Sequence, residues 1–372
     1  MILRTLTVTK FRNLAEAAYD FHPQVNIFTG ENGQGKTNLL EAIYFLSTTR
    51  SFRTTHLVNL PRFEEGSFFV QGTLEREGVT RTISAGLQFT PDRKRELRLN
   101  DQPVTLQKYV SAIQLFAYSS SRLEILRGGP EERRRFIDRG ITSLHPGHIQ
   151  DISRYSRALQ QRNALLQKLN ERRASLSLLD SWDAELAAAA TPIFKARQAY
   201  TTQLLRELNH IVSAHNYHVR DLEMRYQPGG MAEGDDAETL LETLRANRKR
   251  EIAAGFTLAG PHRDNLLFEL RRRPAVEVLS SGELKMVILF LKFAKIHLYR
   301  ARFDEQPLFL LDDVDAELDL GIIGRLLAYI TGTVQIFATS AKQLIFESLD
   351  VGPRRTFHLL SGRAAEVAEK LP

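Results

Sequence analysis

Four residues near the amino terminus have the types and spacing of a phosphate-binding loop. Gly30, Gly35, Lys36 and Thr37 complete the pattern G-x-x-x-x-G-K-T. Glycines let backbone N–H groups curve around phosphate oxygens, because no Cβ stands in the way. The lysine ammonium would reach the β- and γ-phosphates of a nucleotide, and the threonine hydroxyl would bind Mg²⁺. The spacing therefore predicts a site for a nucleoside triphosphate and its magnesium ion.

A second acidic motif follows an apolar run late in the chain, Leu308-Phe-Leu-Leu-Asp-Asp313. A buried strand over these residues would place Asp312 at its carboxyl end, which is where α/β sheets bind ligands. We expect Asp312 to hold Mg²⁺, and Asp313 to position water or act as a general base. An apolar run that ends in Asp is common at strand ends, so this motif alone is a weak indication of a nucleotide site. Together with the P-loop it is a stronger indication.

A third motif, Leu279-Ser-Ser-Gly-Glu283, opens a long helical pattern. It is similar to the L-S-G-G-Q signature of ABC-type ATPases, which contacts the γ-phosphate bound by the opposite subunit. Ser280 and Glu283 also have the spacing of a capping box, in which each side chain binds the other residue's backbone N–H. The two interpretations are compatible, because a helix N-terminus with a Ser hydroxyl is also an anion site. The order of P-loop, signature, strand with two acids and then Leu318-Asp319 is that of the ABC class.

The elements around these motifs indicate an α/β domain that is split in sequence by a helical insertion. The run Val25–Phe28 predicts a strand before the P-loop, and the helical spacing of Leu39, Leu40, Ile43 and Leu46 predicts a helix after it. Further strands are expected over 3–10, 19–21, 67–74, 79–89, 93–99, 113–118, 268–270, 307–311, 334–338 and 355–360. Asn100-Asp101 predicts a hairpin turn after the strand over 93–99, because Asn and Asp tolerate positive φ. Apolar stripes predict helices from about residue 121 onward. Within the longer stripe, Thr191-Pro192 would either kink one long helix or start a second helix. We expect an amino-terminal head over 1–120, a helical arm over 121–250 and the rest of the head over 251–372.

The composition excludes several classes of protein. The 372 residues include no cysteine, so disulfides and Cys-ligated zinc or iron–sulfur sites are excluded. The longest apolar run, 286–293, is too short to span a bilayer, and no apolar signal core follows Met1, so a cytoplasmic location is expected. The net charge of +6 suggests a polyanionic partner.

With these motifs together, the chain resembles the RecF family of bacterial DNA replication and repair proteins, which are relatives of the SMC-type ATPases. The resemblance is close and runs from end to end. The stretches that carry it are 11–14, 30–53, Glu131-Glu-Arg-Arg-Arg-Phe-Ile-Asp138, Gly260-Pro-His-Arg-Asp264, 279–285 and 310–319. It implies an ABC/SMC-type ATPase head that is split by a mostly helical arm.

The resemblance also implies ATP and Mg²⁺ as cofactors and an ATP-dependent homodimer with two composite sites. Hydrolysis would be slow and would separate the dimer. The implied partners are DNA at gaps and single-strand/double-strand junctions, RecR, and through RecR also RecO and RecA; no membrane is involved. The implied nucleotide site comprises Arg12, Asn13, Gly30, Glu31, Asn32, Gly33, Gln34, Gly35, Lys36, Thr37, Asn38, Ser280, Gly282 and Glu283. Lys36 and Asp313 would be catalytic, and Thr37 and Asp312 would hold the metal.

The sequence departs from the family's pattern in three places. Acidic residues that are usual near Tyr118-Ser-Ser-Ser-Arg122 are missing, and Ala316 stands where the family often has Ser. The stretch Ala338-Thr-Ser340 lacks the switch His of transporter ATPases. Those acids, that hydroxyl and that imidazole therefore have no counterpart at these positions.

Two other functions remain open from the sequence. One is the ATP-binding subunit of a membrane transporter, although in such subunits the signature lies much closer to the P-loop. The other is a nucleotide-sensing scaffold with little turnover, because Asp313 is shorter than the usual Glu. If DNA is the partner, the candidate contacts are basic residues that would otherwise form a solvated charged face. They are Arg50, Arg53, Arg93, Lys94, Arg95, Arg133, Arg134, Arg135, Arg248, Lys249 and Arg250.

Overall fold

The computed structural model describes residues 1–119, 124–215, 217–231, 236–313, 320–341 and 352–370. The chain divides into two compact units, the first formed by 1–122 with 303–372 and the second by 123–302. The first boundary between the units, near residue 122, lies close to the boundary expected at 120–121. The second boundary lies at 302–303, whereas we expected it at 250–251. The reason is that β10 (Asn265–Leu270) pairs along its whole length with β9 (Leu222–Gln227), which ties the chain after residue 251 to the helical segment.

The first unit contains a six-stranded sheet in the order β15-β14-β3-β13-β12-β8. All neighbouring strands are parallel except β14 and β15, which are antiparallel. The strands are β3 (Val25–Thr29), β8 (Leu115–Ser119), β12 (Leu308–Asp312), β13 (Gln335–Thr339), β14 (Arg354–Leu360) and β15 (Arg363–Lys370). Every residue of β3, β12 and β13 is buried, as expected for apolar runs in a parallel sheet.

The second sheet of this unit is antiparallel, in the order β2-β1-β4-β5-β6-β7. Its strands are β1 (Ile2–Thr9), β2 (Ala17–Asp20), β4 (Ser67–Arg76), β5 (Val79–Gln88), β6 (Lys94–Leu99) and β7 (Gln102–Pro103). Burial alternates along β4, so one face of the sheet packs on a core. The turn between β6 and β7 consists of Asn100 and Asp101, both at positive φ, which confirms the predicted hairpin.

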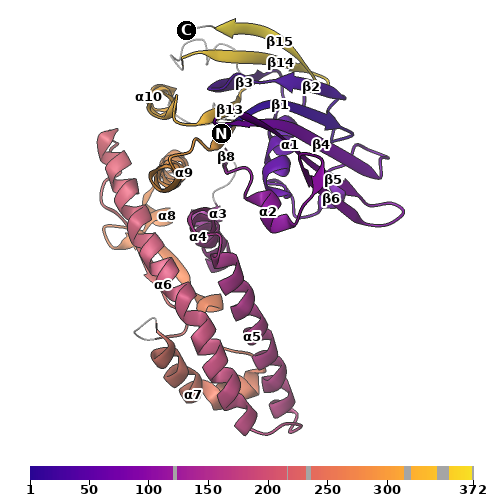
Figure 1. Cartoon of the computed structure of the whole chain (residues 1–372). Coiled ribbons are helices and arrows are strands. Elements are labelled where there is room, and N and C mark those ends of the chain that lie inside the picture. Colours follow the sequence, from indigo (N-terminus) through magenta and orange to yellow (C-terminus); the bar gives the residue numbers. More distant parts are fainter. Residues whose placement is uncertain (120–123, 216, 232–235, 314–319, 342–351, 371–372) are drawn as a thin grey trace. The chain divides into compact units, whose positions relative to one another are not determined.

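Helix α1 (Lys36–Thr48) packs against strands of both sheets, and its buried side chains join them into one apolar core (Figure 1). Aromatic rings fill much of that core; Phe11, Phe45 and Phe68 lie within 6.3 Å of one another, centroid to centroid. Helix α10 (Leu320–Ile330) lies on the side of the parallel sheet away from α1 (Figure 1). The unit also contains η1 (Leu57–Asn59) and α2 (Leu106–Val110).

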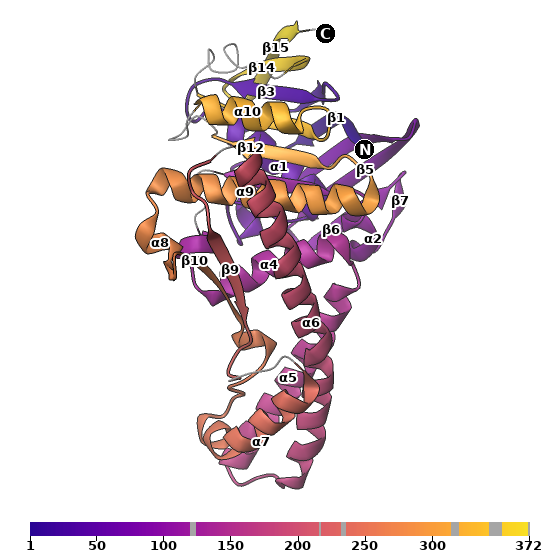
Figure 2. The same cartoon turned by 90° about the vertical axis from the view of Figure 1, so that its left-hand side faces the viewer.

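The second unit is mostly helical. Its elements are α3 (Glu124–Arg127), α4 (Pro130–Leu144), α5 (His148–Asn170), α6 (Ser177–Ala214), α7 (Ala237–Ala254), α8 (Ala275–Val278), α9 (Ser281–Phe303, its last residue excepted), η2 (Pro261–Arg263) and the short strand β11 (Arg273–Pro274) beside β10 and β9. Helices α5 and α6 lie side by side over a long distance, and α7 packs on both (Figures 1 and 2). Pro192 lies inside α6, so the first of the two alternatives for Thr191-Pro192, one long helix, is correct.

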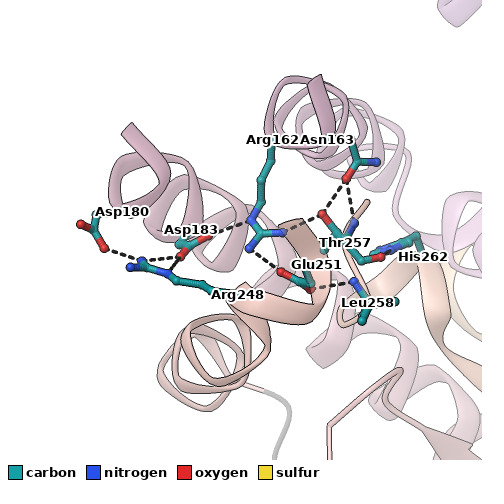
Figure 3. A network of polar contacts seen from close by, with 9 residues as sticks. All are labelled: Arg162, Asn163, Asp180, Asp183, Arg248, Glu251, Thr257, Leu258 and His262. Atoms are coloured by element: carbon teal, nitrogen blue, oxygen red, sulfur yellow. Dashed lines mark hydrogen bonds and ion pairs between the residues drawn. The ribbon is translucent and has the colours of Figure 1, made fainter. Parts of the chain in front are cut away.

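A buried polar network holds α5, α6 and α7 together (Figure 3). Arg162 of α5 has no exposed surface, and its guanidinium donates to Asp183 at 2.7 Å, to Glu251 at 2.7 Å and to Thr257 at 2.8 Å. Both carboxylates are also fully buried. Arg248 of α7 donates to the second oxygen of Asp183 at 2.7 Å. A buried charge is tolerated only when it is paired and hydrogen-bonded, and this network meets both conditions.

No helix among the described residues is both long enough and apolar enough to span a membrane.

Candidate functional site

The P-loop connects β3 to α1 in the first unit, as the sequence predicts. Gly30, Gly33 and Gly35 have φ values of 139°, 84° and 107°, which L side chains rarely adopt. A Cβ on Gly30 would lie 2.5 Å from the carbonyl oxygen of Leu359 on β14, so the loop leaves β3 against its neighbouring strand. Gly35 caps α1 without a side-chain hydrogen bond, so a bound anion can accept from the N–H groups at the start of this helix.

Lys36 is the first residue of α1 and is 8% exposed. Its Nζ donates to the carbonyl oxygens of Gly30 at 2.6 Å and Glu31 at 2.9 Å, so the ammonium lies inside the curve of the loop. An ammonium held there can bind the phosphate oxygens of a nucleotide that the loop surrounds.

The carboxylate of Asp312 joins the P-loop helix to two strands. Its Oδ1 accepts hydrogen bonds from the hydroxyls of Thr37 and Thr339, both at 2.9 Å. Burial raises the pKa of Asp312 above its ordinary value, while the hydroxyls of Thr339 and Thr37 act in the opposite direction. Thr339 ends β13, the strand between β3 and β12, and its role is not among the predictions from the sequence. The sequence could have indicated it, because Thr339 follows the strand predicted over 334–338 and parallel strands end at the same edge of a sheet.

Asp313 follows β12 and is exposed. Its backbone N–H donates to Thr339 Oγ1 at 2.8 Å, and its φ is 56°, so the chain turns sharply after Asp312. The turn directs the two adjacent acids to different surroundings, one buried and one solvent-accessible.

Arg12 packs on the outer side of α1. Its Nε and one terminal nitrogen donate to the two carboxylate oxygens of Glu41 at 2.9 and 3.0 Å, and the other terminal nitrogen donates to Asn59 O at 2.7 Å. Glu41 is fully buried and also accepts from Ser51 Oγ. Arg53 donates to Asn38 Oδ1 at 2.6 Å. Glu41 therefore organises the basic residues beside the P-loop, and nothing in the sequence patterns marked it.

The other predicted nucleotide contacts of this unit are also close together. Asn13 Nδ2 donates to Gly33 O at 3.2 Å, and Asn38 Nδ2 donates to Asn13 Oδ1 at 2.7 Å. The side chain of Gln34 accepts from the Ser361 N–H at 2.6 Å, so the loop is fixed to the turn after β14. Glu31 and Asn32 are exposed in the loop.

A groove of about 780 Å³ adjoins these residues. The segment after β1 contributes Arg12 and Asn13 to its lining, and α1 contributes Asn38. The loop after η1 contributes Phe63, whose surface is 88% exposed. The volume is within the range of small-molecule sites, and the lining mixes cationic, amide and aromatic groups.

Ser280, Gly282 and Glu283 belong to the second unit, at the start of α9. The Ser280 N–H donates to Glu283 Oε2 at 2.7 Å, and the Glu283 N–H donates to Ser280 Oγ at 3.3 Å. These reciprocal bonds confirm the predicted capping box. Gly282 lies in the first turn between them.

Several of the basic residues that are candidate DNA contacts bind groups of the protein itself. Arg133 donates to Asn265 Oδ1 at 3.1 Å, and Arg134 donates to Asp264 O at 2.8 Å. Arg135 pairs with Glu131 and Glu132, and Arg248 pairs with Asp180 and Asp183. In this structure these four arginines therefore bind groups of the protein itself, and they stay predictions as DNA contacts.

Other candidates are better placed for a polyanion. Arg93, Lys94 and Arg95 are exposed at the start of β6, and no salt bridge within the described parts of the chain involves them. Arg50, Lys249 and Arg250 are also exposed. The predicted Leu318-Asp319 and the departures at Ala316 and 120–122 lie outside the residues that the structure describes.

Two of the stretches that carry the family resemblance meet inside the second unit. Asp264 of Gly260-Pro-His-Arg-Asp264 accepts from Arg197 at 2.6 Å, and Arg197 binds both carboxylate oxygens of Asp138 at 2.9 and 2.8 Å. Asp138 ends the stretch that begins at Glu131. Both stretches thus contribute to packing within this unit.

Comparisons with known proteins are consistent with each other. The pattern of the RecF/RecN/SMC N-terminal domain family matches residues 2–357. Two relatives are described as DNA replication and repair protein RecF, and both are 35% identical to this chain. The match to the protein of Lactobacillus johnsonii covers 91% of this chain and 92% of the relative. The match to the protein of Lactobacillus acidophilus covers 97% of this chain and 98% of the relative. A solved structure described as the recombination mediator protein RecF-ATP in the RecFOR pathway has a TM-score of 0.88 at 26% identity, covering 99% of this chain and 98% of its own. An Smc head bound to the C-winged helix domain of ScpA, with a TM-score of 0.56 at 14% identity and coverage of 99% and 97%, shares the fold.

Proposed function

Because this chain belongs to the RecF family of SMC-type ATPases, we propose that it binds and hydrolyses ATP and acts on DNA in replication and recombinational repair. The observation that carries the ATPase part is the contact between Thr37 of the P-loop helix and Asp312 at the end of β12. This contact joins the two motifs of a nucleotide site, which lie far apart in sequence. Membership of this family favours a repair ATPase over a transporter subunit.

The phosphates of ATP would lie in the curve of the P-loop, where Lys36 and the N-terminus of α1 balance their charge. The nucleoside would occupy the groove beside Asn13 and Asn38, where Arg12 and Phe63 provide flat surfaces for a base. A relative was solved with ATP, which supports this assignment.

Thr37 and Asp312 fit a magnesium ion, because hydroxyl and carboxylate oxygens are the ligands that this ion prefers. The two side chains are already within hydrogen-bond distance of each other. Bound there, Mg²⁺ would neutralise charge on the phosphates. Asp313, which is exposed beside Asp312, would orient the attacking water and accept its proton.

The start of α9 would serve a second copy of the chain. Ser280 Oγ and the first N–H groups of α9 would receive the γ-phosphate of ATP held by the partner's P-loop, which makes the homodimer depend on ATP. Hydrolysis would be slow, would be stimulated by DNA and would release the dimer. Gly282 lets the partner's phosphate approach the helix closely.

The proposed DNA substrate is a gap or a junction of single and double strands, bound by exposed cations such as Arg93, Lys94 and Arg95. The proposed protein partners are RecR and, through it, RecO, and the outcome would be loading of RecA onto single strands. The RecFOR pathway to which a solved relative is assigned supports this group of partners.

The test combines self-association with hydrolysis. Light scattering over a concentration series with ATP, ADP and no nucleotide should detect a dimer with ATP alone, and turnover per chain should rise with protein concentration. Lys36→Met should abolish ATP binding, whereas Lys36→Arg should keep part of the binding and lose turnover, because the guanidinium places its charge elsewhere. Wild-type turnover in Lys36→Arg would refute the P-loop assignment. Single-turnover hydrolysis separates this function from a nucleotide-sensing scaffold, which would bind ATP without cleaving it.

A further inference from the structure

The last residue of the signature-like motif has an unusual charge. Glu283 stands at the position that is the neutral Gln in L-S-G-G-Q. Hydrogen bonds from Ser280 and His218 lower the pKa of Glu283 to about 2, so the side chain is an anion at any physiological pH. A carboxylate at the start of α9 would repel a phosphate that approaches the same place.

The imidazole of His218 contacts the carboxylate of Glu283. Its Nε2 lies 2.6 Å from Glu283 Oε1, the oxygen that does not accept from the Ser280 N–H. Because the carboxylate is ionised, the imidazole N–H donates to it. Both oxygens of Glu283 are therefore engaged, one in capping α9 and the other by His218.

The segment that carries His218 is anchored on the same helix. The ring of the preceding residue, Tyr217, is buried and lies 5.1 Å from the ring of Phe290 on α9, centroid to centroid. Burial and the nearby Glu283 raise the pKa of Tyr217 to about 12, so this phenol stays neutral. His218 itself has a side chain that is 68% exposed, so it borders solvent where a second chain would approach.

We propose that His218 is a positioning residue of the signature half-site: its Nε2–H holds Oε1 of Glu283 and keeps the carboxylate away from the path of the γ-phosphate. The chain thereby uses a Glu–His pair in place of the neutral Gln. This inference rests on the proposed composite ATP site and deepens it.

The experiment is a double-mutant cycle on the full chain with His218→Gln, Glu283→Gln and the two changes together. ATP-driven association is measured by light scattering, and the kcat and KM of hydrolysis are measured above and below the association concentration. His218→Gln should weaken association by about tenfold, since the carboxylate of Glu283 is then free to turn toward the phosphate. The double variant should match Glu283→Gln, because without the carboxylate His218 has no anion to hold in place.

The control is His210→Gln, which removes an exposed imidazole from α6 in the same unit and should leave association unchanged. ATP binding to the isolated chain, measured below the association concentration, should be equal in all variants. If the wild type associates with ATP and His218→Gln associates equally well, the inference fails and the proposed function stands. A defect of His218→Gln that persists in the double variant also overturns it. If the wild type does not associate with ATP, both the proposed composite site and the proposed role of His218 are refuted.

Discussion

Asp312 is held by two hydroxyls, and only one of them belongs to the P-loop. The Thr37 hydroxyl is a proposed metal ligand and would leave Asp312 when Mg²⁺ and the nucleotide bind. The Thr339 hydroxyl is not a proposed metal ligand, so it can continue to donate to the carboxylate of Asp312. Thr339 also accepts from the backbone of Asp313, so a single hydroxyl fixes both acids. Residues that orient a metal ligand affect metal binding nearly as much as the ligands do.

We therefore expect Thr339→Val to weaken Mg²⁺-dependent ATP binding by about 10- to 100-fold, the range usual for partners of metal ligands. Isothermal titration with and without Mg²⁺ measures this effect, and binding without the metal should change little. Thr331→Val is the control, since the Thr331 hydroxyl donates to Leu327 O and does not contact either acid. Equal Mg²⁺ dependence in Thr339→Val and the wild type would contradict the assigned role.

At the scale of elements, the network around Arg162 joins α5, α6 and α7 (Figure 3). Arg162→Met should lower the free energy of unfolding of this unit by about 3–5 kcal/mol, because two carboxylates then lose their buried partner. Urea unfolding followed by circular dichroism measures the change. Arg154→Met is a matched control, since Arg154 also joins α5 to α6 by pairing with Glu185, but at the surface. An exposed pair contributes no more than about 1 kcal/mol, so similar losses in the two variants would show that the network is unimportant.

The contacts of η2 predict a dependence on pH. His262 accepts a hydrogen bond from the Tyr155 hydroxyl at 2.6 Å and donates to Thr257 O at 3.1 Å, which fixes the neutral ring. Burial lowers the pKa of His262 to about 4 from 6.5. Between these values the unfolded chain binds more protons than the folded chain, so the free energy of unfolding falls as the pH drops from 6.5 to 4, by on the order of 3 kcal/mol.

Urea midpoints at intervals across this pH range test the prediction. The slope should be smaller in His262→Gln, which cannot take up the proton. A variant whose stability falls as steeply as that of the wild type would show that other groups cause the loss.

The sequence predicts the elements better than their connections. Strong periodicity and turn residues locate the P-loop strand and helix, the Asn100-Asp101 turn and the capping box at Ser280. Strand β9 is missed because its alternation of Leu222, Met224 and Tyr226 with polar residues spans only six residues. The chain changes from one compact unit to the other at 302–303 and not at 250–251, since β9 pairs with β10. Contacts such as Thr339–Asp312 and His218–Glu283 join residues far apart in the chain, and no local pattern predicts them.

For the whole molecule, the net charge of +6 and the exposed cations of β6 make a prediction about DNA. Affinity should fall steeply with salt and show no base preference, because binding to phosphates releases counterions. Changing Arg93, Lys94 and Arg95 together to Gln should reduce the slope of log affinity against log salt by about 0.9 for each duplex phosphate that these cations neutralise. Gel shifts on gapped, single- and double-stranded DNA at several salt concentrations measure the slope. The control is Arg172→Gln with Arg173→Gln, two exposed cations after α5 that are not among the candidates. An unchanged slope in the β6 variant would remove β6 from the DNA surface.

The first unit consists of two stretches of sequence, and this has a consequence for how the protein is made. Strand β3 leads into the P-loop, yet both strands that flank it, β13 and β14, lie in the segment 303–372. During translation the five buried residues of β3 must therefore wait, unpaired, until residues 335–339 of β13 have left the ribosome, and their second neighbour, β14, follows later. A nascent chain of this design exposes an apolar strand for most of its synthesis, which invites aggregation or chaperone binding. A ribosome that stops before β13 releases a chain with an intact G-x-x-x-x-G-K-T sequence but without the two strands that flank β3.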